Sequence, residues 1–363
     1  MTKSDLKAPE PKRVKEWKLP SGVLSAALSE DGEKILCGCL DGVYLVDMET
    51  SEISKLYAHD SYVSSVEWLS DRTLVSAGYD GRIIWFDMQE AQEIRSEKAH
   101  QFWSWDLAIS NDRSILASVT GQYLAGGYRY EPAAESEPSI RVYEAQGGQL
   151  LHKLPHVPSV QAVAISPDGK SVAAGNLMGE IRIYDLETGN IQYQWTTKDF
   201  TSWGIIKSHS YLGGIFSMRY TPDGDSLLLA GMGPMRDPMA GNGRQLWQRW
   251  DLATDEPKLV DQTHEGESGE GLMEALAVDP DASFFVMGGR LRGGDWNAAF
   301  FDLHQGHRLA TLKTGFRITD TRFYNSGGTL LVAGATGQGK PKKDKSFGAF
   351  GRIELYETAP QDS

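Results

Sequence analysis

Three carboxylates stand at nearly the same point of similar sequence runs, where they could supply a catalytic acid and base. They are Asp106 in SWDLAI, Glu274 in MEALAV and Asp320 in ITDTRF. General acid–base hydrolysis commonly uses two carboxyl groups whose surroundings give them different pKa values. The alternative is that these acids are solvated or form ion pairs with Arg219 and Arg322, which lie in comparable runs. The three acids are therefore weak catalytic candidates.

The acidic segment THEGESGEG, residues 263–271, raises the question of a metal site. His264 lies there beside Glu265, Glu267 and Glu270. Zinc needs three or four converging ligands, and calcium loops need closely spaced oxygen atoms around a sharp turn. One histidine in a Gly-Glu segment meets neither requirement, so we expect no metal. The glycine-rich segments GGYRY, GMGPM and GQGKPKK do not join a strand to a helix, so we predict no phosphate loop and no cofactor.

The elements that would have to position these residues repeat along the chain. A run that ends in an acid recurs seven times, as in VYLVDMET (43–50), IIWFDMQE (83–90) and IRIYDLETG (181–189). Ahead of each copy lies a run of the form apolar-x-x-apolar-x-apolar, followed by a turn such as Ser-Pro-Asp-Gly. Pro, Asp and Gly favour the dihedral angles of a tight reversal. With a polar outer segment such as NIQYQW, each unit is predicted to be four strands.

Seven such units indicate one architecture. Four-stranded sheets at a period of roughly 40 to 58 residues, without helical segments between them, are typical of a β-propeller. A single sheet of this kind has two apolar faces, and radial stacking on its neighbours buries both. We predict an all-β fold, a seven-bladed β-propeller of four-stranded antiparallel blades.

In a propeller the first strand of each unit lines the central channel. The equivalent positions in the seven units are Ser25, Ser65, Asp106, Ala162, Ser217, Ala275 and Asp320. The positions one step earlier are Leu24, Ser64, Trp105, Gln161, Phe216, Glu274 and Thr319. None of these is a histidine, and titratable groups do not cluster among them as they do in an enzyme site. The sequence also contains no nucleophile elbow and no Ser-His-Asp constellation in the required context.

One unit carries a family resemblance. The segment SAGYDGRIIWFD, with AHDSYVSSV before it, resembles the blade of the WD-repeat family. In that family a His, a Ser or Thr, an Asp and a Trp share a hydrogen-bond network inside the blade. His59, Ser76 and Asp80 match the first three members, whereas Phe86 holds the Trp position, so the indole donor is missing. The resemblance implies the architecture and a structural blade network, but no activity, because this fold hosts many functions.

The N-terminal residues are predicted to close the ring. The segment VKEWKL, residues 14–19, parallels the outer segment SKLYAH before the second unit, whereas the last unit ends at RIELYETA without such a strand. We therefore predict that residues 14–19 complete the seventh blade and remove an exposed sheet edge. The alternative is a disordered tail. The predicted organisation is a flexible tail at 1–13, one propeller at 14–359 and a C-terminal tail at 360–363.

Long connections interrupt the repeats at one end of the ring. Turns between second and third strands lengthen at 121–138, 231–244, 288–296 and 334–351, and links between units lengthen at 196–214 and 263–272. Long connections are often functional, and aromatic and arginine side chains dominate contact energies at interfaces. The alternative is that the aromatic side chains pack down as loop anchors. The predicted binding residues are Trp103, Tyr128, Trp203, Tyr211, Arg236, Arg290, Arg292 and Trp296.

Composition limits the partner and the compartment. The 363 residues carry 36 Lys and Arg against 49 Asp and Glu, a net charge of −13 that disfavours nucleic acid and anionic membranes. The sequence shows no signal peptide and no apolar run long enough to span a bilayer. Cys37 and Cys39 stand two residues apart, unlike a CxxC pair, and are interpreted as reduced thiols of a cytoplasmic protein.

These observations favour a non-catalytic cytoplasmic scaffold that binds a protein or peptide through its loop-rich end. The arginines are consistent with an acidic or main-chain-rich peptide. Two alternatives stay open. One is a hydrolase-like propeller enzyme with an acid pair near the channel, and the other is a sensor that binds a small ligand or sugar with the same aromatic side chains.

Overall fold

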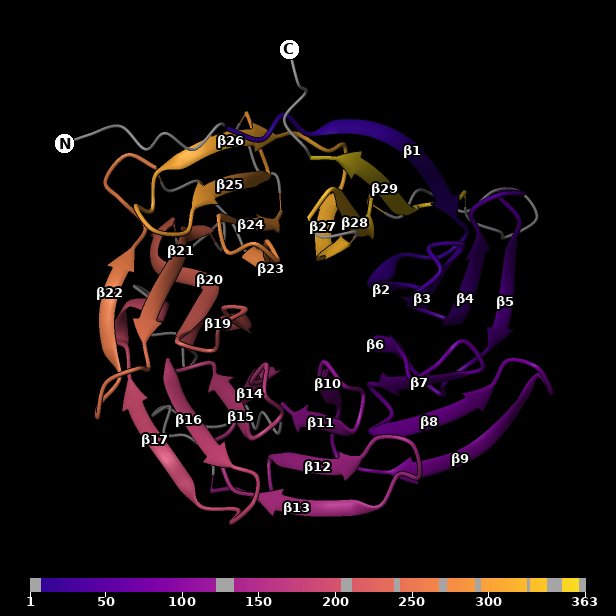
Figure 1. The fold of residues 1–363 in the computed structure, drawn as a ribbon, viewed down its shortest axis with the longest axis horizontal. Coiled ribbons are helices and arrows are strands. Elements are labelled where there is room, and N and C mark those ends of the chain that lie inside the picture. Colours follow the sequence, from indigo (N-terminus) through magenta and orange to yellow (C-terminus); the bar gives the residue numbers. More distant parts are fainter. Residues whose placement is uncertain are drawn as a thin grey trace.

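Seven antiparallel sheets form from the repeated units in the computed structural model of the chain (Figure 1). The structure describes residues 8–121, 134–203, 211–237, 242–267, 273–290, 295–324, 327–337 and 348–358, with the backbone alone at 201–203, 211–213, 234–237 and 242. The sheets stand around a central axis, and the first strand of each lies nearest that axis. The predicted seven-bladed propeller is confirmed.

The first four blades follow the predicted order of strands from the axis outwards. Blade 1 consists of β2 (Val23–Leu28), β3 (Lys34–Cys39), β4 (Gly42–Asp47) and β5 (Ile53–Tyr57). Blade 2 consists of β6 (Val63–Trp68), β7 (Thr73–Gly78), β8 (Arg82–Asp87) and β9 (Gln92–Lys98). Blade 3 consists of β10 (Ser104–Ile109), β11 (Ile115–Thr120), β12 (Ile140–Glu144) and β13 (Leu150–Leu154). Blade 4 consists of β14 (Val160–Ile165), β15 (Ser171–Asn176), β16 (Glu180–Asp185) and β17 (Ile191–Thr196).

The last three blades include one departure from the four-stranded pattern. Blade 5 has five strands, β18 (Thr201–Trp203), β19 (Tyr211–Tyr220), β20 (Ser226–Asp237), β21 (Asn242–Asp251) and β22 (Lys258–Gln262). Blade 6 consists of β23 (Met273–Val278), β24 (Phe284–Gly289), β25 (Ala298–Asp302) and β26 (Arg308–Leu312). Blade 7 consists of β27 (Arg317–Tyr324), β28 (Thr329–Ala335), β29 (Gly351–Glu357) and β1 (Lys12–Leu19).

Short polar side chains fix the turn that follows the inner strand in four of the blades. In the Ser-Pro-Asp-Gly turn of blade 4, the Ser166 hydroxyl donates to Asp168 Oδ1 at 2.6 Å, and the amide of Ser171 donates to Ser166 Oγ at 2.9 Å. Gly169 takes a φ of +71°, a conformation that favours glycine. The same Ser or Thr to Asp hydrogen bond occurs in blades 1, 3 and 5. The recurring turn residues therefore reverse the chain at the same end of the ring.

The hydrophobic core lies between blades. Seven clusters of buried residues are found in the described part of the chain, and each joins two neighbouring blades. One cluster, for example, packs Leu36 and Val43 of blade 1 against Val63 and Leu74 of blade 2. Each sheet is thus apolar on both faces, as radial stacking requires.

The strand β1 completes blade 7 by pairing antiparallel with β29, from Lys12 opposite Glu357 to Leu19 opposite Gly351. The strand begins two residues earlier than predicted, at Lys12. Trp17 and Leu19 are buried in the cluster between blades 7 and 1, whereas Val14 on the same strand is exposed. The pairing of the N-terminal strand with the C-terminal one is consistent with the predicted closure of the ring.

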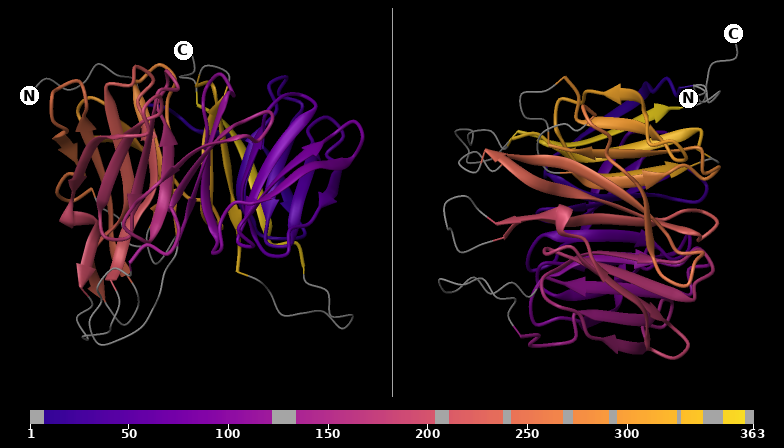
Figure 2. Two further views of the ribbon diagram at one scale, coloured as in Figure 1. Left: turned by 90° about the horizontal axis from the view of Figure 1, so that it is seen from below. Right: turned by 90° about the vertical axis from the view of Figure 1, so that its left-hand side faces the viewer.

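The blade 5 hairpin extends the loop-rich end of the ring (Figure 2). The register of β20 and β21 continues from Ser226 opposite Asp251 to Asp237 opposite Asn242. Beside it lies the 3-10 helix η1 (Lys198–Phe200), whose Phe200 is fully buried against Ile215 and its neighbours. Within the described residues, no helix has the length and apolar character that crossing a bilayer requires.

Removing one buried side chain of β1 is expected to destabilise the whole ring. Leu19→Ala removes a fully buried side chain between blades 7 and 1, so the free energy of unfolding should fall by about 2–5 kcal/mol. Val14→Ala, at a position 48% exposed on the same strand, is the matched control and should change it by less than about 0.5 kcal/mol. Urea unfolding measures both. Equal effects of the two substitutions would contradict the role of β1 in closing the ring.

Candidate functional site

The ring encloses a cavity of about 860 Å³ on its axis. Residues of all seven innermost strands line it. Five of the seven predicted channel positions contribute to the lining, namely Ser25, Ser65, Asp106, Ser217 and Asp320. All seven positions one step earlier in the sequence do so as well, namely Leu24, Ser64, Trp105, Gln161, Phe216, Glu274 and Thr319.

Polar side chains of the inner strands join neighbouring blades at several of the interfaces. The Asp320 carboxylate of blade 7 accepts a hydrogen bond from the amide of Ala26 in blade 1, at 3.0 Å. The amide of Val66 in blade 2 donates to Ser25 Oγ of blade 1 at 3.3 Å, and the amide of Val163 in blade 4 donates to Asp106 Oδ2 of blade 3 at 3.1 Å. These side chains occupy equivalent positions and use the same type of contact. Two of the weak catalytic candidates, Asp106 and Asp320, therefore bridge blades.

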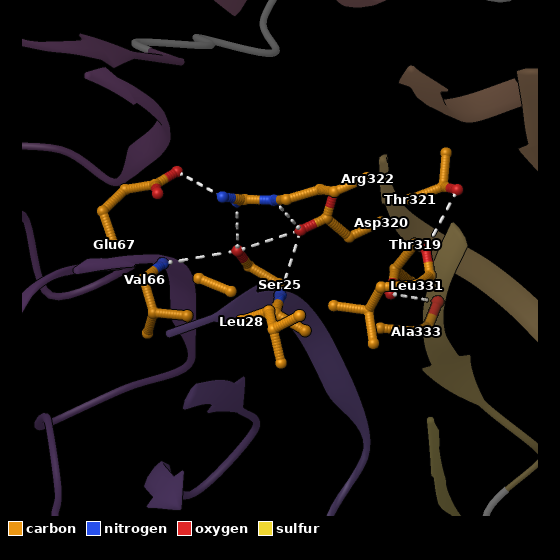
Figure 3. Close-up of polar contacts among 12 residues, drawn as sticks. Ser25, Leu28, Val66, Glu67, Thr319, Asp320, Thr321, Arg322, Leu331 and Ala333 are labelled. Atoms are coloured by element: carbon orange, nitrogen blue, oxygen red, sulfur yellow. Dashed lines mark hydrogen bonds and ion pairs between the residues drawn. The ribbon is translucent and has the colours of Figure 1, made fainter. Parts of the chain in front are cut away.

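Arg322 lies at the centre of a charged network between blades 7, 1 and 2 (Figure 3). Its guanidinium contacts Glu67 Oε1 at 2.7 Å, Asp320 Oδ2 at 3.2 Å and Ser25 Oγ at 3.3 Å. Ser25 Oγ also donates to Asp320 Oδ2 at 3.2 Å. Burial raises the pKa of Glu67, and the positive charge of Arg322 opposes that shift. The pairing of Asp320 with Arg322, which the sequence left as an alternative, is present in the structure.

The carboxyl group of Asp106 is strongly perturbed by its position in the channel. Burial raises its pKa to about 6, against the opposing effects of Arg219 and of the amides of Val163 and Leu107. The charge of Asp320 raises it further. A carboxyl group with this pKa carries a proton at mildly acidic pH, as a general acid would. Both of its oxygens, however, accept backbone hydrogen bonds, Oδ1 from Leu107 at 2.9 Å and Oδ2 from Val163 at 3.1 Å.

The third acidic candidate, Glu274, forms a two-pronged ion pair with Arg317 of the next blade. Arg317 Nε donates to Glu274 Oε2 at 2.6 Å, and its Nη2 contacts Oε1. Burial raises the pKa of Glu274, while the Arg317 hydrogen bond and charge, together with the charge of Arg290, lower it. The structure thus holds Asp106, Glu274 and Asp320 with three different sets of partners along the cavity.

An aromatic cluster occupies the cavity mouth between blades 2 and 3. It consists of Tyr62, Tyr79, Phe102, Trp103 and Trp105. Tyr79 stacks on Trp103 at 4.9 Å between ring centroids and 10° between planes, and Trp103 stacks on Phe102 at 4.8 Å. Tyr62, Tyr79 and Trp105 line the cavity itself. These residues come from the turn between β7 and β8, the links before β6 and β10, and the start of β10, so the cluster belongs to the loop-rich end.

Two members of the aromatic cluster face solvent. Tyr62 is 47% exposed and Trp103 is 41% exposed. The other large exposed apolar side chains of the described residues stand on outer strands of different blades, namely Val14, Ile94, Leu151, Ile191 and Val260. Single exposed apolar residues are normal on protein surfaces, whereas a contiguous aromatic patch marks an interaction site. The sequence pointed to Trp103 and missed Tyr62 and Tyr79, which lie in short connections rather than in long ones.

The structure describes the side chains of only some of the remaining predicted binding residues. Arg290 is exposed, and Trp296 is half-buried against the core between blades 5 and 6, with the Arg308 guanidinium 5.2 Å from its ring. Trp203 and Tyr211 pair across β18 and β19, and Arg236 lies near the tip of β20, with the backbone alone described at all three. Tyr128 and Arg292 lie outside the described residues. The structure therefore brings Trp103 to the aromatic cluster and anchors Trp296 in the body.

A hydrogen-bond network orders blade 2. His59 Nδ1 lies 3.1 Å from both carboxylate oxygens of Asp80, and His59 Nε2 lies 2.8 Å from Ser76 Oγ. The hydroxyl of Tyr57 also lies 2.8 Å from Ser76 Oγ, and its ring stacks on Phe86 at 4.5 Å. A tyrosine of the preceding outer strand thus supplies a polar partner where the expected indole donor is missing. The sequence did not reveal this contact because Tyr57 belongs to another unit.

In blades 3 and 4, other side chains accept backbone hydrogen bonds at the corresponding end of the blade. In blade 3 the Glu137 carboxylate accepts hydrogen bonds from the amide of Gln101, at 2.9 and 3.1 Å. In blade 4 the amide oxygen of Asn176 accepts from the amides of Met178 and Glu180. Burial lowers the pKa of His100 to about 3 in blade 3 and that of His156 to about 4 in blade 4, so both histidines are neutral at pH 7. They are buried parts of their blades.

Comparison with known proteins finds a matching family. Residues 50–87 match the family described as "WD domain, G-beta repeat". This segment covers the strands from β5 to β8 and includes His59, Ser76 and Asp80. It is the unit in which the sequence carried the resemblance.

Several curated proteins are similar over part of the chain. Mouse telomerase protein component 1 is 28% identical over 171 residues, which are 47% of this chain and 6% of that protein. The guanine nucleotide-binding protein subunit beta of Oryza sativa subsp. indica is 24% identical over 184 residues, 46% of this chain and 45% of that protein. WD repeat-containing protein SL1-17 of Schistosoma mansoni is 26% identical over 164 residues, 44% of this chain and 50% of that protein. The matches thus span half or less of each relative.

Removing the central cation of the channel network is expected to destabilise the ring. Arg322→Ala leaves the carboxylates of Glu67 and Asp320 without their shared partner, so the free energy of unfolding at pH 7 should fall by about 3–5 kcal/mol. Arg113→Ala breaks a solvent-exposed pair with Glu30 and should cost less than about 1 kcal/mol. Urea unfolding compares the two variants. A loss in Arg322→Ala no larger than in Arg113→Ala would show that the network does not stabilise the ring.

Titration of Asp106 is expected to make stability fall as pH rises. Its pKa is about 6 in the folded chain against 3.8 for an ordinary Asp, so between these values the unfolded chain releases a proton that the folded chain keeps. The stability that Asp106 contributes is complete below pH 3.8 and is lost as pH rises to about 6. The difference in unfolding free energy between the native chain and Asp106→Asn should therefore fall by about 3 kcal/mol over this window.

Asp112→Asn is the control for the Asp106 titration. Hydrogen bonds from Ser110 and Ser114 lower the pKa of Asp112. The stability that Asp112 contributes is therefore lost only as pH falls below 3.8, which is opposite in direction to the effect of Asp106. Urea unfolding at pH 4, 5, 6 and 7 gives the profiles. A flat difference between the native chain and Asp106→Asn across this range would contradict the raised pKa of Asp106.

Proposed function

Because this chain is a seven-bladed WD-repeat β-propeller, we propose that it is a non-catalytic scaffold that binds a protein or peptide at the loop-rich end of its ring. WD-repeat propellers generally bind proteins, and the relatives include a guanine nucleotide-binding protein subunit and a WD repeat-containing protein. The observation that carries the proposal is the aromatic cluster at the cavity mouth. It combines exposed, stacked rings with a rigid support.

The rigidity of the aromatic cluster suits recognition. Tyr62 and Trp103 are exposed, and stacking on Tyr79 holds Trp103 in place before a partner arrives. Aromatic side chains that are already ordered bring a large contact area at low entropic cost. An apolar or aromatic side chain of the partner would lie on the exposed rings and extend towards the cavity.

Charges near the aromatic cluster favour a partner with an acidic residue. Burial raises the pKa of Tyr79 to about 12. The charge of Glu274 raises this pKa further and the charge of Arg317 lowers it, so both charges reach the aromatic cluster at the mouth. Arg317 is engaged with Glu274, whereas Arg290 is exposed and acts on the same carboxylate. We propose that Arg290 contacts an acidic group of the partner, in agreement with the charge expected from the sequence.

The proposed partner and compartment follow from charge and from the cysteines. A net charge of −13 supports a protein partner over nucleic acid or an anionic membrane. Cys37 and Cys39 are both free and buried, and burial raises the pKa of both thiols, which keeps them protonated. Unreactive free thiols support a location in the cytoplasm.

The raised pKa of Asp106 is the one observation that favours the alternative, an acid–base enzyme in the channel. Against it, Asp106 and Asp320 hold neighbouring blades together, and Glu274 is paired with Arg317. Carboxylates committed to such contacts suit a rigid ring better than proton transfer. We therefore prefer the scaffold.

The proposal is tested with peptides selected against the native chain. A random peptide library is panned on the immobilised protein, and the affinity of each selected peptide is then measured for two double variants. In Tyr62→Ala/Trp103→Ala the exposed part of the aromatic cluster is removed, so peptide affinity should fall at least tenfold, as expected for aromatic contacts at the centre of an interface.

The matched control removes two exposed apolar side chains from outer strands. Ile94→Ala/Leu151→Ala changes residues 56% and 41% exposed on β9 and β13, far from the cavity mouth, and should leave affinity within twofold. Unchanged melting temperatures establish that both variants fold. Peptides that bind the two double variants equally well would place the binding surface elsewhere and overturn the proposal.

A further inference from the structure

Three potential metal ligands from two blades come together on the outer rim of the ring. His264 and Glu267 belong to the link that follows β22 of blade 5, and His307 belongs to the turn between β25 and β26 of blade 6. Each offers a ligand atom, and these atoms all lie within 4.8 Å of one another. The sequence drew attention to His264 and Glu267 but led us to expect no metal, because that segment contains a single histidine. The second histidine comes from a unit about 40 residues further along the chain.

A glycine allows the two blades to approach closely at this point. Gly306 precedes His307 and has a φ of +67°, which favours glycine. A Cβ at this position would lie 2.4 Å from Asp261 Oδ2 and 2.8 Å from His264 Nε2, distances that real side chains do not adopt. The turn of blade 6 therefore packs directly on the side chains that end the outer strand of blade 5.

Hydrogen bonds from neighbouring groups orient two of the three ligands. His264 Nε2 lies 3.0 Å from Asp261 Oδ1, and the His264 ring lies near the ring of Trp247 and nearly perpendicular to that of His307. Glu267 Oε2 accepts a hydrogen bond from the amide of Arg308 at 3.1 Å. Carboxylates that hydrogen-bond ligand histidines, and hydrogen bonds that hold ligand carboxylates, are the outer contacts that fix metal ligands in proteins.

The donor set indicates the class of ion. Two imidazole nitrogens and one carboxylate oxygen suit zinc and similar transition-metal ions, whereas calcium and magnesium prefer oxygen ligands alone. His307 is exposed and His264 and Glu267 are half-buried, so an ion can reach the site from solvent and keep a water ligand. We propose that His264, Glu267 and His307 bind one Zn²⁺ ion, which ties the link between blades 5 and 6 to the rim of blade 6.

The proposal is independent of peptide binding at the cavity mouth, and Zn²⁺ itself is the probe. The full chain is prepared without a histidine tag and stripped with EDTA, and Zn²⁺ binding is then measured by titration calorimetry. One Zn²⁺ ion per chain is expected at the tightest site, and the melting temperature should rise with the Zn²⁺ concentration because the ion binds the folded chain. Absence of saturable Zn²⁺ binding by the native chain would overturn the proposal.

Variants separate this site from adventitious binding by other histidines. His264→Ala/His307→Ala should lower the Zn²⁺ affinity at least 100-fold, and the conservative Asp261→Asn should lower it about tenfold through loss of the carboxylate that orients His264. His304→Ala, an exposed histidine in the same turn as His307, is the matched control and should bind Zn²⁺ within threefold of the native chain.

Melting temperatures in EDTA establish that each variant folds without metal. The single variant His307→Ala serves in place of the double one if the latter is unstable, because His307 is exposed and its removal leaves the core intact. Zn²⁺ affinity that is equal in the native chain and in the variants without His307, or that falls as much in His304→Ala, would assign the binding to another place and overturn the proposal.

Discussion

The structure depends on the fact that each sheet is apolar on both faces. A blade with two such faces is stable in water only when a neighbour covers each of them, and the seven clusters of buried residues lie between blades accordingly. The same constraint makes the N-terminal strand important. The pairing of β1 with β29 joins the two ends of the chain within one sheet, and Leu19 is buried against blade 1.

Polar contacts near the axis give these apolar interfaces a defined geometry. Hydrophobic burial has no preferred direction, whereas a hydrogen bond from the amide of one inner strand to a side chain of the next fixes how far the two blades are offset. Ser25, Asp106 and Asp320 make this contact at three of the blade interfaces. Their position on the inner strands explains why acids that resemble catalytic candidates in the sequence are part of the framework in the structure.

The architecture could be predicted from the sequence because it rests on local, repeated signals. Turns similar to Ser-Pro-Asp-Gly and acid-terminated runs recur along the chain, and each fixes its own piece of backbone. The extra strand β18 was missed because three residues inside a long link carry no recognisable pattern. Of the predicted site residues, only those whose neighbours lie in the same unit, such as His59 with Ser76 and Asp80, could be grouped in advance.

Contacts between units could not be predicted from the sequence, and the physical reason is the same for all of them. Tyr57 of blade 1 contacts Ser76 of blade 2 through its hydroxyl group, and Tyr79 of blade 2 stacks on Trp103 in the link to blade 3. His264 and His307 meet across the interface between blades 5 and 6. Each depends on how one sheet is rotated relative to the next, and a sequence pattern of separate units does not encode that rotation.

The uneven distribution of side chains around the cavity mouth restricts how the proposed partner could bind there. On one side, blades 2 and 3 contribute the aromatic cluster, and on another, blades 6 and 7 contribute the paired charges of Glu274 and Arg317. A ring of identical blades would offer the same chemistry in every direction and would bind a partner in several equivalent orientations. Apolar rings beside an ion pair break that symmetry, because a partner that turned an acidic group towards Trp103 would lose hydration without compensation. Under the proposed function, a peptide that carries an apolar side chain next to an acidic one should therefore bind at the mouth in one orientation.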